Sequence, residues 1–377
     1  MRTNMFRSPD SITKGGESTR PSPVYRRMTK VIISIFTVGM SLCLSTNVFA
    51  QHYQQTNLVS DVPGLAARTD PHLVNAWGLA RSSGSPWWVA DNGTGVSTLY
   101  TGTGAIVPLV VTVPVPPGGT PPSTPTGAVF NATPADFHGD RFIFVTEDGT
   151  ISGWSGGTNA VLRKNNAGSA IYKGVTIAQI NGVNFLYAAN FFSGAVEVFD
   201  TNYMPFTNLG SSAFTDPKLP AGFAPFNVQN INGSVFVTFA KQGEGNEDEV
   251  DGPGLGYVDA FDSSGNLLMR LKSGRWMNAP WGVVLAPDDF GEPGGRLLVG
   301  QFGSGEIASF DPENGNFHGL LRGPHGQPLS IDGLWALSFG NDAGAGSSKT
   351  LFFTAGIDGE EHGLFGTITP IPGDDDN

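Results

Sequence analysis

The sequence has almost no cysteine and few charged residues. Cys43 is the only cysteine among 377 residues, and charged residues make up 14% of the chain. Without a second cysteine no intramolecular disulfide can form, and the chain after Cys43 has no thiol for catalysis or metal binding. The fold must therefore be held together by packing and hydrogen bonds.

Several catalytic motifs are also missing. The chain has no Gly-x-Ser-x-Gly elbow, no phosphate-binding glycine loop ending in Lys-Ser/Thr, no His-Glu-x-x-His and no cysteine pair for haem. These absences disfavour serine esterases, nucleotide-dependent enzymes, zinc proteases and c-type cytochromes. They leave open a hydrolase whose metal is held by oxygen ligands, because that chemistry needs only carboxylates, amides and a base.

Residues 1–50 have the pattern of a signal peptide, with either an over-extended start or a long basic region before Met28. Basic residues in Arg26–Lys30 precede an apolar run, and Val48–Ala50 supplies the small residues for cleavage before Gln51. The run is short for a membrane span. We expect an exported protein, periplasmic or extracellular, whose mature chain has no membrane span; Sec and twin-arginine export both remain open.

The mature chain is acidic. Residues 1–50 hold seven of the 21 basic and two of the 33 acidic residues, which leaves 14 basic and 31 acidic residues. This balance argues against nucleic acid as a partner. It permits cations and neutral or basic small molecules.

One short string occurs twice, as NAWGLA from Asn75 and as NAPWGVVLAP from Asn278. Weaker copies place a small or polar residue at intervals of 47 to 55 residues, at Gly78, Gly127, Gly174, Asn227, Gly282 and Ala336. After each comes a β-branched or aromatic run, a glycine-rich turn and an alternating run. A period near 50 with strand-like content predicts an all-β fold, a six-bladed β-propeller with one sheet per repeat.

The small residues are expected where first strands crowd around the central channel, so that neighbouring backbones can approach closely. Trp77, Trp281 and Trp335 are predicted to pack in the core between blades. The last repeat lacks a fourth strand, and Gln55–Val62 resembles a fourth strand without a blade. We therefore predict that this N-terminal strand closes the ring.

The predicted domain organisation is a signal peptide at residues 1–50, a single propeller at 51–370 and an acidic tail at 371–377. In the fourth repeat, residues 241–256 replace the tight turn by a long acidic loop. Long loops in compact folds are often functional.

With these strings in hand, the chain resembles an uncharacterised family of secreted bacterial proteins with NHL-type six-bladed propellers. The resemblance rests on NLVSD, NAWG, ADNGTGVSTLY, PTGAVFN, EDGTISGW, APFNVQ, NAPWGVVLAP, DGLWALSFG and EEHGLFG, and covers nearly all of residues 55–369. It implies no established activity. More distantly, the architecture is similar to gluconolactonase-type enzymes, a likeness of fold alone.

Loops that enter first strands and loops that join second to third strands share one face of a propeller, and that face holds the candidate site. Oxygen ligands suit Ca²⁺ or Mg²⁺, and the predicted metal ligands are Glu147, Asn190, Asn278 and Asp332. The predicted ligand-binding residues are Asn75, Asn92, Lys173 and Gln301. Glu361 and His362 are the candidate catalytic base residues; a metal site with His362 and a solvated hairpin loop are the alternatives for the stretch from Gly356 to Gly363. For the asparagines and turn carboxylates, a structural role in hydrogen bonding is the alternative.

Two functions follow from this pattern. The first is an exported binding or scaffold propeller that recognises a small molecule, glycan or protein at the channel mouth, with or without Ca²⁺. The alternative is a metal-dependent lactone or ester hydrolase or lyase, of lactonase-like type. An ion in the enzyme needs an open coordination position and a nearby base, whereas a structural ion is enclosed by protein oxygens.

Overall fold

Nearly all the regular structure is β-strand. The computed structural model describes residues 51–372, so the predicted signal peptide and residues 373–377 of the predicted tail lie outside it. The other regular elements in this range are two turns of 3-10 helix, η1 (Phe137–Gly139) and η2 (Glu244–Asn246). Within residues 51–372, no helix is long and apolar enough to cross a membrane.

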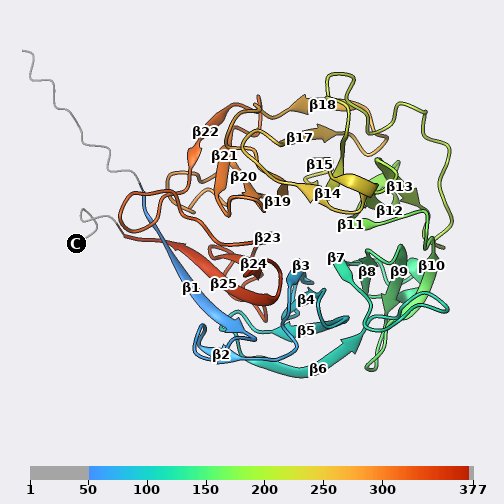
Figure 1. The fold of residues 1–377 in the computed structure, drawn as a ribbon, viewed down its shortest axis with the longest axis horizontal. Helices are drawn as coiled ribbons and strands as arrows, with labels where there is room; N and C mark the ends of the chain where they lie inside the picture. Colours follow the sequence, from blue (N-terminus) through green and yellow to red (C-terminus); the bar gives the residue numbers. More distant parts are fainter. Residues whose placement is uncertain (1–50, 373–377) are drawn as a thin grey trace, which may run out of the picture. The chain divides into compact units, whose positions relative to one another are not determined.

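The strands form six largely antiparallel sheets, the blades, around a common centre (Figure 1). Blade 1 contains β3 (Ala76–Ala80), β4 (Trp87–Asp91), β5 (Val96–Tyr100) and β6 (Ile106–Thr112). Blade 2 contains β7 (Pro125–Phe130), β8 (Phe142–Thr146), β9 (Thr150–Trp154) and β10 (Val161–Asn165). Blade 3 has three strands, β11 (Tyr172–Ile180), β12 (Val183–Asn190) and β13 (Ala195–Phe199).

The second half of the ring follows the same order. Blade 4 contains β14 (Phe223–Ile231), β15 (Ser234–Gln242), β17 (Gly256–Phe261) and β18 (Leu267–Arg270), with the short β16 (Glu249–Val250) on β15. Blade 5 contains β19 (Pro280–Leu285), β20 (Leu297–Gln301), β21 (Ile307–Phe310) and β22 (Phe317–Leu320). Blade 6 contains β23 (Leu334–Phe339), β24 (Leu351–Ile357) and β25 (His362–Pro370). First strands of neighbouring blades contact each other all the way around, and β23 contacts β3. The six-bladed propeller predicted from the repeat is confirmed.

The N-terminal strand completes the last blade. β1 (Tyr53–Ser60) pairs antiparallel with β25, from Tyr53 opposite Pro370 to Ser60 opposite Leu364, and β2 (Arg68–Thr69) adds to its outer edge. In Figure 1 the two ends of the described chain accordingly lie in the same sheet, blue beside red. The predicted closure of the ring by this segment is confirmed.

The repeating small residues lie where first strands meet. A Cβ atom on Gly127 of blade 2 would lie 2.8 Å from the backbone nitrogen of Val175 in blade 3. One on Gly282 of blade 5 would lie 2.7 Å from the carbonyl oxygen of Trp335 in blade 6. Both distances are below van der Waals contact, so the approach of neighbouring first strands requires glycine at these positions.

The core consists of apolar layers between adjacent blades. Between blades 2 and 3, for example, Val145 and Ile151 pack in one cluster with Leu186 and Ala188, all fully buried. Alternation along each strand sends successive side chains to opposite faces, so every blade contributes to two layers. This packing holds the loops of one face in fixed positions around the channel.

Candidate functional site

An aromatic cluster fills the centre of the ring. The ring of Trp335 stacks on Trp77 with centroids 3.7 Å apart and on Phe302 at 4.0 Å. Trp281 meets both tryptophans edge-on, at 6.5 and 6.0 Å, and Phe226 lies 5.8 Å from Trp335. The three tryptophans are at most 5% exposed. Their predicted core role is confirmed, although they pack against one another rather than only between adjacent blades.

A chain of polar side chains from four blades lies beside this cluster; we call it the mouth network. Asn75 donates through Nδ2 to Glu360 at 2.7 Å and to the Oδ1 atom of Asn92 at 3.3 Å. Asn92 in turn donates to Glu147 at 2.8 Å, and the other oxygen of Glu147 lies 2.5 Å from the Nζ atom of Lys173. Three of the four predicted ligand-binding residues therefore lie in one network.

The network is tied to the aromatic cluster by hydrogen bonds and by charge. The indole nitrogen of Trp335 donates to Asn75 at 3.0 Å, and that of Trp281 donates to the carbonyl of Lys173 at 2.9 Å. The ammonium of Lys173 lies 5.2 Å from the ring centre of Trp77, within cation–π range. The two copies of the Asn-Ala-(Pro)-Trp-Gly string thus place Trp77 and Trp281 in the channel, and the first copy also places Asn75 in the mouth network.

Lys173 is the central charge of the network. Its side chain is 1% exposed, and besides Glu147 its ammonium lies 3.3 Å from Asp248 of the acidic loop. Burial by itself lowers the pKa of a lysine, but the carboxylates of Glu147 and Glu249 outweigh it and raise the pKa of Lys173 above its ordinary value. The residue is therefore a charged ammonium at neutral pH and not a nucleophilic amine.

Two further carboxyl groups at the mouth are perturbed. Burial raises the pKa of Glu249 to about 7, with Lys173 opposing the shift and Glu360 adding to it. Burial also raises the pKa of Glu360, against the hydrogen bond from Asn75. Glu249 belongs to β16, which pairs with the end of β15 through Gln242 and so brings the acidic loop to the mouth. For both groups, burial therefore favours the neutral carboxylic acid over the carboxylate.

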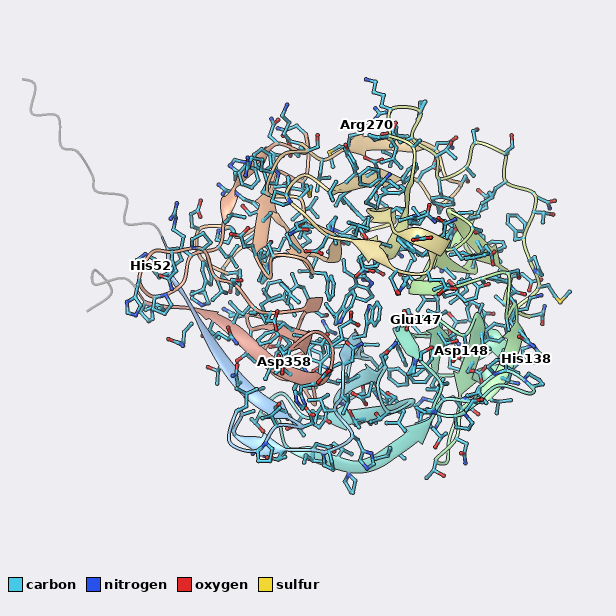
Figure 2. The ribbon with its side chains drawn as sticks, in the orientation of Figure 1. His52, His138, Glu147, Asp148, Arg270 and Asp358 are labelled. Carbon is cyan, nitrogen blue, oxygen red and sulfur yellow. The ribbon has the colours of Figure 1, made fainter. Side chains whose placement is uncertain are left out.

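A cavity of about 350 Å³ opens next to Glu147; we call it the mouth cavity. Its lining residues are Glu147, Asp148, Gly168, Ala170, Ile171, Phe192 and Glu247. Glu147 lies nearer the centre of the ring than Asp148 (Figure 2). Phe192 is 37% exposed and is the one aromatic residue among the exposed large apolar side chains of residues 51–372. Three carboxylates beside an open aromatic face form a site suited to a positively charged molecule.

The predicted metal ligands have separate partners; they are Glu147, Asn190, Asn278 and Asp332. Asn190 donates to Glu197 in its own blade at 2.8 Å. The side-chain oxygens of Asn278 and Asp332 accept backbone N–H groups at 2.5 and 2.7 Å. Within residues 51–372, no hydrogen bond joins two of the four, and no group of three His, Cys, Asp or Glu side chains could hold a metal ion. The Ca²⁺ or Mg²⁺ site stays a prediction.

The remaining predicted residues lie outside the mouth network. Gln301 is buried and accepts the backbone N–H of Asn278 at 2.8 Å, a structural contact. His362 lies 2.7 Å from Asp61, whose hydrogen bond raises the pKa of the imidazole, and Glu361 next to it is exposed. Asp61 was not anticipated from the sequence, because it is 301 residues away from His362 in the chain. The catalytic role of Glu361 and His362 stays a prediction.

Phe192 and Glu360 belong to the candidate site although no sequence motif singled them out. Phe192 follows Asn190 in the loop between the second and third strands, and the adjacent Phe-Phe pair on a loop was the available signal. Glu360 has a φ of +70°, an uncommon conformation for a side chain other than glycine, and it bonds to Asn75. The short loop therefore holds its carboxylate toward the mouth at some cost in backbone strain.

The fold and the mouth define the class of protein: a six-bladed β-propeller whose channel is filled by aromatic side chains and whose mouth is acidic. No model of a known protein family matches the chain. It is 32% identical to uncharacterized protein R648 of Acanthamoeba polyphaga mimivirus over 330 residues, which cover 82% of this chain and 78% of that protein. It is 31% identical to uncharacterized protein L690 of the same virus, with 82% and 84% covered. The chain belongs to the family of these mimivirus proteins.

Solved structures support the fold alone. A protein of unknown function from Bacteroides thetaiotaomicron has a TM-score of 0.54 at 12% identity, covering 85% of this chain and 76% of that one. A streptogramin B lyase has a TM-score of 0.51 at 11% identity, covering 85% and 98%. The relatives are viral, so the bacterial and secreted character implied by the earlier resemblance stays a prediction.

Proposed function

We propose that this chain is a ligand-binding propeller that recognises a small molecule carrying an organic ammonium cation at the mouth cavity. The observation that carries the proposal is the lining of that cavity, in which Glu147, Asp148 and Glu247 lie with the exposed ring of Phe192. Carboxylates and an aromatic face both stabilise organic cations. A volume of about 350 Å³ lies within the range of small-molecule sites.

The charge around the cavity supports a cationic ligand over an anionic one. The ammonium of Lys173 is buried and already bonded to Glu147 and Asp248. The carboxylates of Asp148 and Glu247 add negative charge to the cavity itself. The excess of acidic residues in the whole chain extends this field outward and raises the local concentration of cations.

Binding is better supported than catalysis. Every side chain of the mouth network has a protein partner, so the network holds a shape and does not present a free nucleophile. The candidate base His362 is bonded to Asp61, and within residues 51–372 no hydrogen bond connects it to the mouth network. The metal-dependent hydrolase or lyase therefore ranks second, because no contact among residues 51–372 favours it over a binding protein.

Export from the cytoplasm is also part of the proposal. The sequence of residues 1–50 supports export, with cleavage before Gln51. Sequencing the N-terminus of the protein recovered outside the cytoplasm would test this. A mature protein that begins at Gln51 is expected, whereas full-length protein retained in the cytoplasm would contradict it.

Titration calorimetry of the full chain with choline tests the binding proposal. The control compound is 3,3-dimethyl-1-butanol, which has the same shape without the charge. We expect choline to bind and the alcohol not to bind. Glu247→Gln should weaken choline binding by about 1 kcal/mol, roughly fivefold. Glu244→Gln is the matched control, because Glu244 lies in the same acidic loop but does not line the cavity.

Phe192→Leu separates the aromatic contribution from volume. We expect it to weaken choline binding by about 0.5–1 kcal/mol, since it removes the π face and keeps an apolar side chain. Equal binding of choline and its uncharged analogue would contradict the proposal. So would choline binding that neither Glu247→Gln nor Phe192→Leu changes.

A further inference from the structure

Blade 3 is the only three-stranded blade in the described part of the ring. Its outer strand, β13, pairs with β12 on one side only, from Asn190 opposite Ala195 to Leu186 opposite Phe199. The other five blades each have a fourth strand at this place. β13 is therefore a sheet edge, the feature by which an extended chain can add to a sheet.

The following segment begins to cover this edge and then leaves it. The N–H of Phe206 donates to the carbonyl of Val198 at 2.7 Å, and Phe199 forms an isolated bridge with Pro205. Along an antiparallel strand, backbone groups alternate between the two sides. Val196, two residues before Val198, accordingly directs its N–H and C=O toward the same open side. No strand continues after Phe206 to take them.

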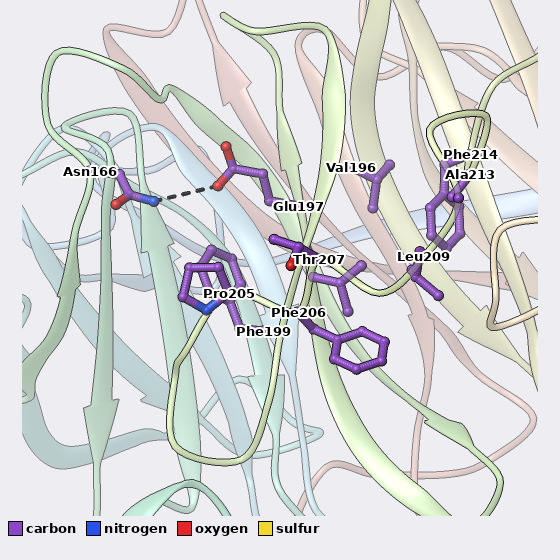
Figure 3. A pocket seen from close by; sticks show the side chains of 12 residues that line it. Asn166, Val196, Glu197, Phe199, Pro205, Phe206, Thr207, Leu209, Ala213 and Phe214 are labelled. Carbon is purple, nitrogen blue, oxygen red and sulfur yellow. Dashed lines mark hydrogen bonds between the residues drawn. The ribbon is translucent and has the colours of Figure 1, made fainter.

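A cavity of about 340 Å³ lies where the missing strand would run (Figure 3); we call it the edge groove. Its wall is β13 on one side and the segment of residues 205–214 on the other. The side chains of Val196 and Val198 face the layer that also holds Phe206 and Leu209. An added strand would place every second side chain in this apolar layer.

The remaining side chains of an added strand, on its other face, would lie near a carboxylate. Glu197 also lines the edge groove, and it accepts hydrogen bonds from Tyr172 at 2.6 Å, Asn190 at 2.8 Å and Asn166 at 3.4 Å. All three donors are neutral, and Glu197 has no ion-pair partner among residues 51–372. An incoming ammonium or guanidinium group would supply the missing charge. A second copy of this acidic chain would offer poor charge complementarity to Glu197.

We propose that an extended segment of a basic partner protein adds to β13 as the fourth strand of blade 3. Its apolar side chains enter the layer of Val196, Val198 and Phe206, and its alternate Lys or Arg side chains pair with Glu197. The backbone of the partner bonds to the N–H and C=O of Val196 and to the N–H of Val198, whose C=O is already bonded to Phe206. This site is on the outer rim of the ring and is independent of the mouth cavity.

The test uses a labelled peptide of about seven alternating Val and Lys residues, with binding to the full chain followed by fluorescence anisotropy. Two control peptides test the charge interaction and the backbone pairing separately. The first has Glu in place of Lys and so reverses the charge. The second is the same Val-Lys peptide with alternate backbone nitrogens methylated, which removes backbone donors. We expect only the unmodified Val-Lys peptide to bind. Hydrogen exchange at the amides of Val196 and Val198 should slow when it does.

Variants of the groove complete the test. Glu197→Gln keeps most hydrogen bonds and removes the charge, so we expect about tenfold weaker binding. Glu313→Gln, on an exposed turn of blade 5, is the control for net charge and should have no effect. Val196→Pro removes the outward N–H without touching the pairing to β12. If that variant does not fold, the methylated peptide still measures backbone pairing.

Three results would overturn the proposal. Equal loss of binding in Glu197→Gln and Glu313→Gln would indicate non-specific attraction to an acidic surface. Self-association of the chain that Val196→Pro abolishes would assign the edge to a second copy. Peptide binding that appears only after residues 1–50 are removed would assign the edge groove to that segment.

Discussion

At the scale of single residues, the neighbouring carboxyl groups of Asp259 and Asp216 make the stability of the protein depend on pH. Asp259 on β17 is 2% exposed, and its burial together with the nearby charge of Asp216 raises its pKa to about 7. Arg270 opposes this shift and binds Asp216 through its Nε atom at 2.6 Å. The folded protein therefore holds a proton on Asp259 that the unfolded chain releases near the ordinary value of 3.8.

The sign of the effect follows from proton linkage. Between about pH 4 and pH 7 the folded state binds more protons than the unfolded state at this residue, so stability falls as pH rises through that window. We expect Asp259→Asn to raise the free energy of unfolding at pH 8 by on the order of 1–3 kcal/mol, with little change at pH 4. Urea unfolding at both pH values measures this. An equal effect at both pH values would show that the titration is not responsible.

Asp262, three residues further on, is the contrasting control. Although burial works against it, hydrogen bonds from Asn266 and Ser264 lower the pKa of Asp262. The contribution of Asp262 to the stability of the folded protein is therefore present at neutral pH and is lost as its carboxylate is protonated in acid. Asp262→Asn should destabilise the protein at pH 8 and have less effect at low pH, the reverse of Asp259→Asn.

Lys173 is the second residue whose removal we expect to matter. Lys173→Met leaves Glu147 without its buried partner and should lower the free energy of unfolding by about 2–3 kcal/mol. Adding Glu147→Gln should restore part of this loss, because the uncompensated charge is then gone. Chemical denaturation of the two single variants and the double variant gives the coupling energy. Additive losses would mean that the pair does not act as a unit.

At the scale of elements, the first strands depend on their small residues. A Cβ on Gly78 of β3 would overlap the backbone around Thr126 and Ala128 of β7. Gly78→Ala should therefore lower the stability by about 2–4 kcal/mol, since backbone has to shift. Gly84→Ala is the control, because a Cβ there meets nothing within 4 Å and its φ is not positive. Melting temperatures compare the two, and equal values would contradict the crowding argument.

At the scale of the whole molecule, the ring is closed by strand pairing. The one cysteine, Cys43, lies outside the described residues, so no disulfide can join blade 1 to blade 6. β1 supplies the closure, with Tyr53 and Val59 at most 1% exposed. Removing residues 1–60 exposes the edge of β25 and opens apolar layers to water.

We expect the chain that lacks residues 1–60 to lose cooperative unfolding and to aggregate. The chain that lacks only residues 1–50 keeps β1 and serves as the control. Thermal unfolding followed by circular dichroism, with light scattering for aggregation, distinguishes the two. Identical melting curves would show that β1 is not needed to hold the ring.

The candidate site was predictable in part, because repeat position determines the face on which a residue lies. Asn75, Asn92 and Lys173 were assigned to the mouth by their place in the repeat, and they share one network. The same reasoning placed Asn190 on that face, but its amide bonds to Glu197 within blade 3. Repeat position specifies the loop and not the direction of the side chain.

The architecture could be predicted without coordinates, because the period near 50 residues, the alternation within strands and the small residue at each first strand imply six blades. These are local signals, and each is visible within one repeat. Three features became visible only in the folded chain: the tryptophans fill the channel, Asn75 bonds to Glu360, and blade 3 has an open edge. The reason is physical. Asn75 and Glu360 are 285 residues apart, and such contacts form only when the closed ring brings distant loops together.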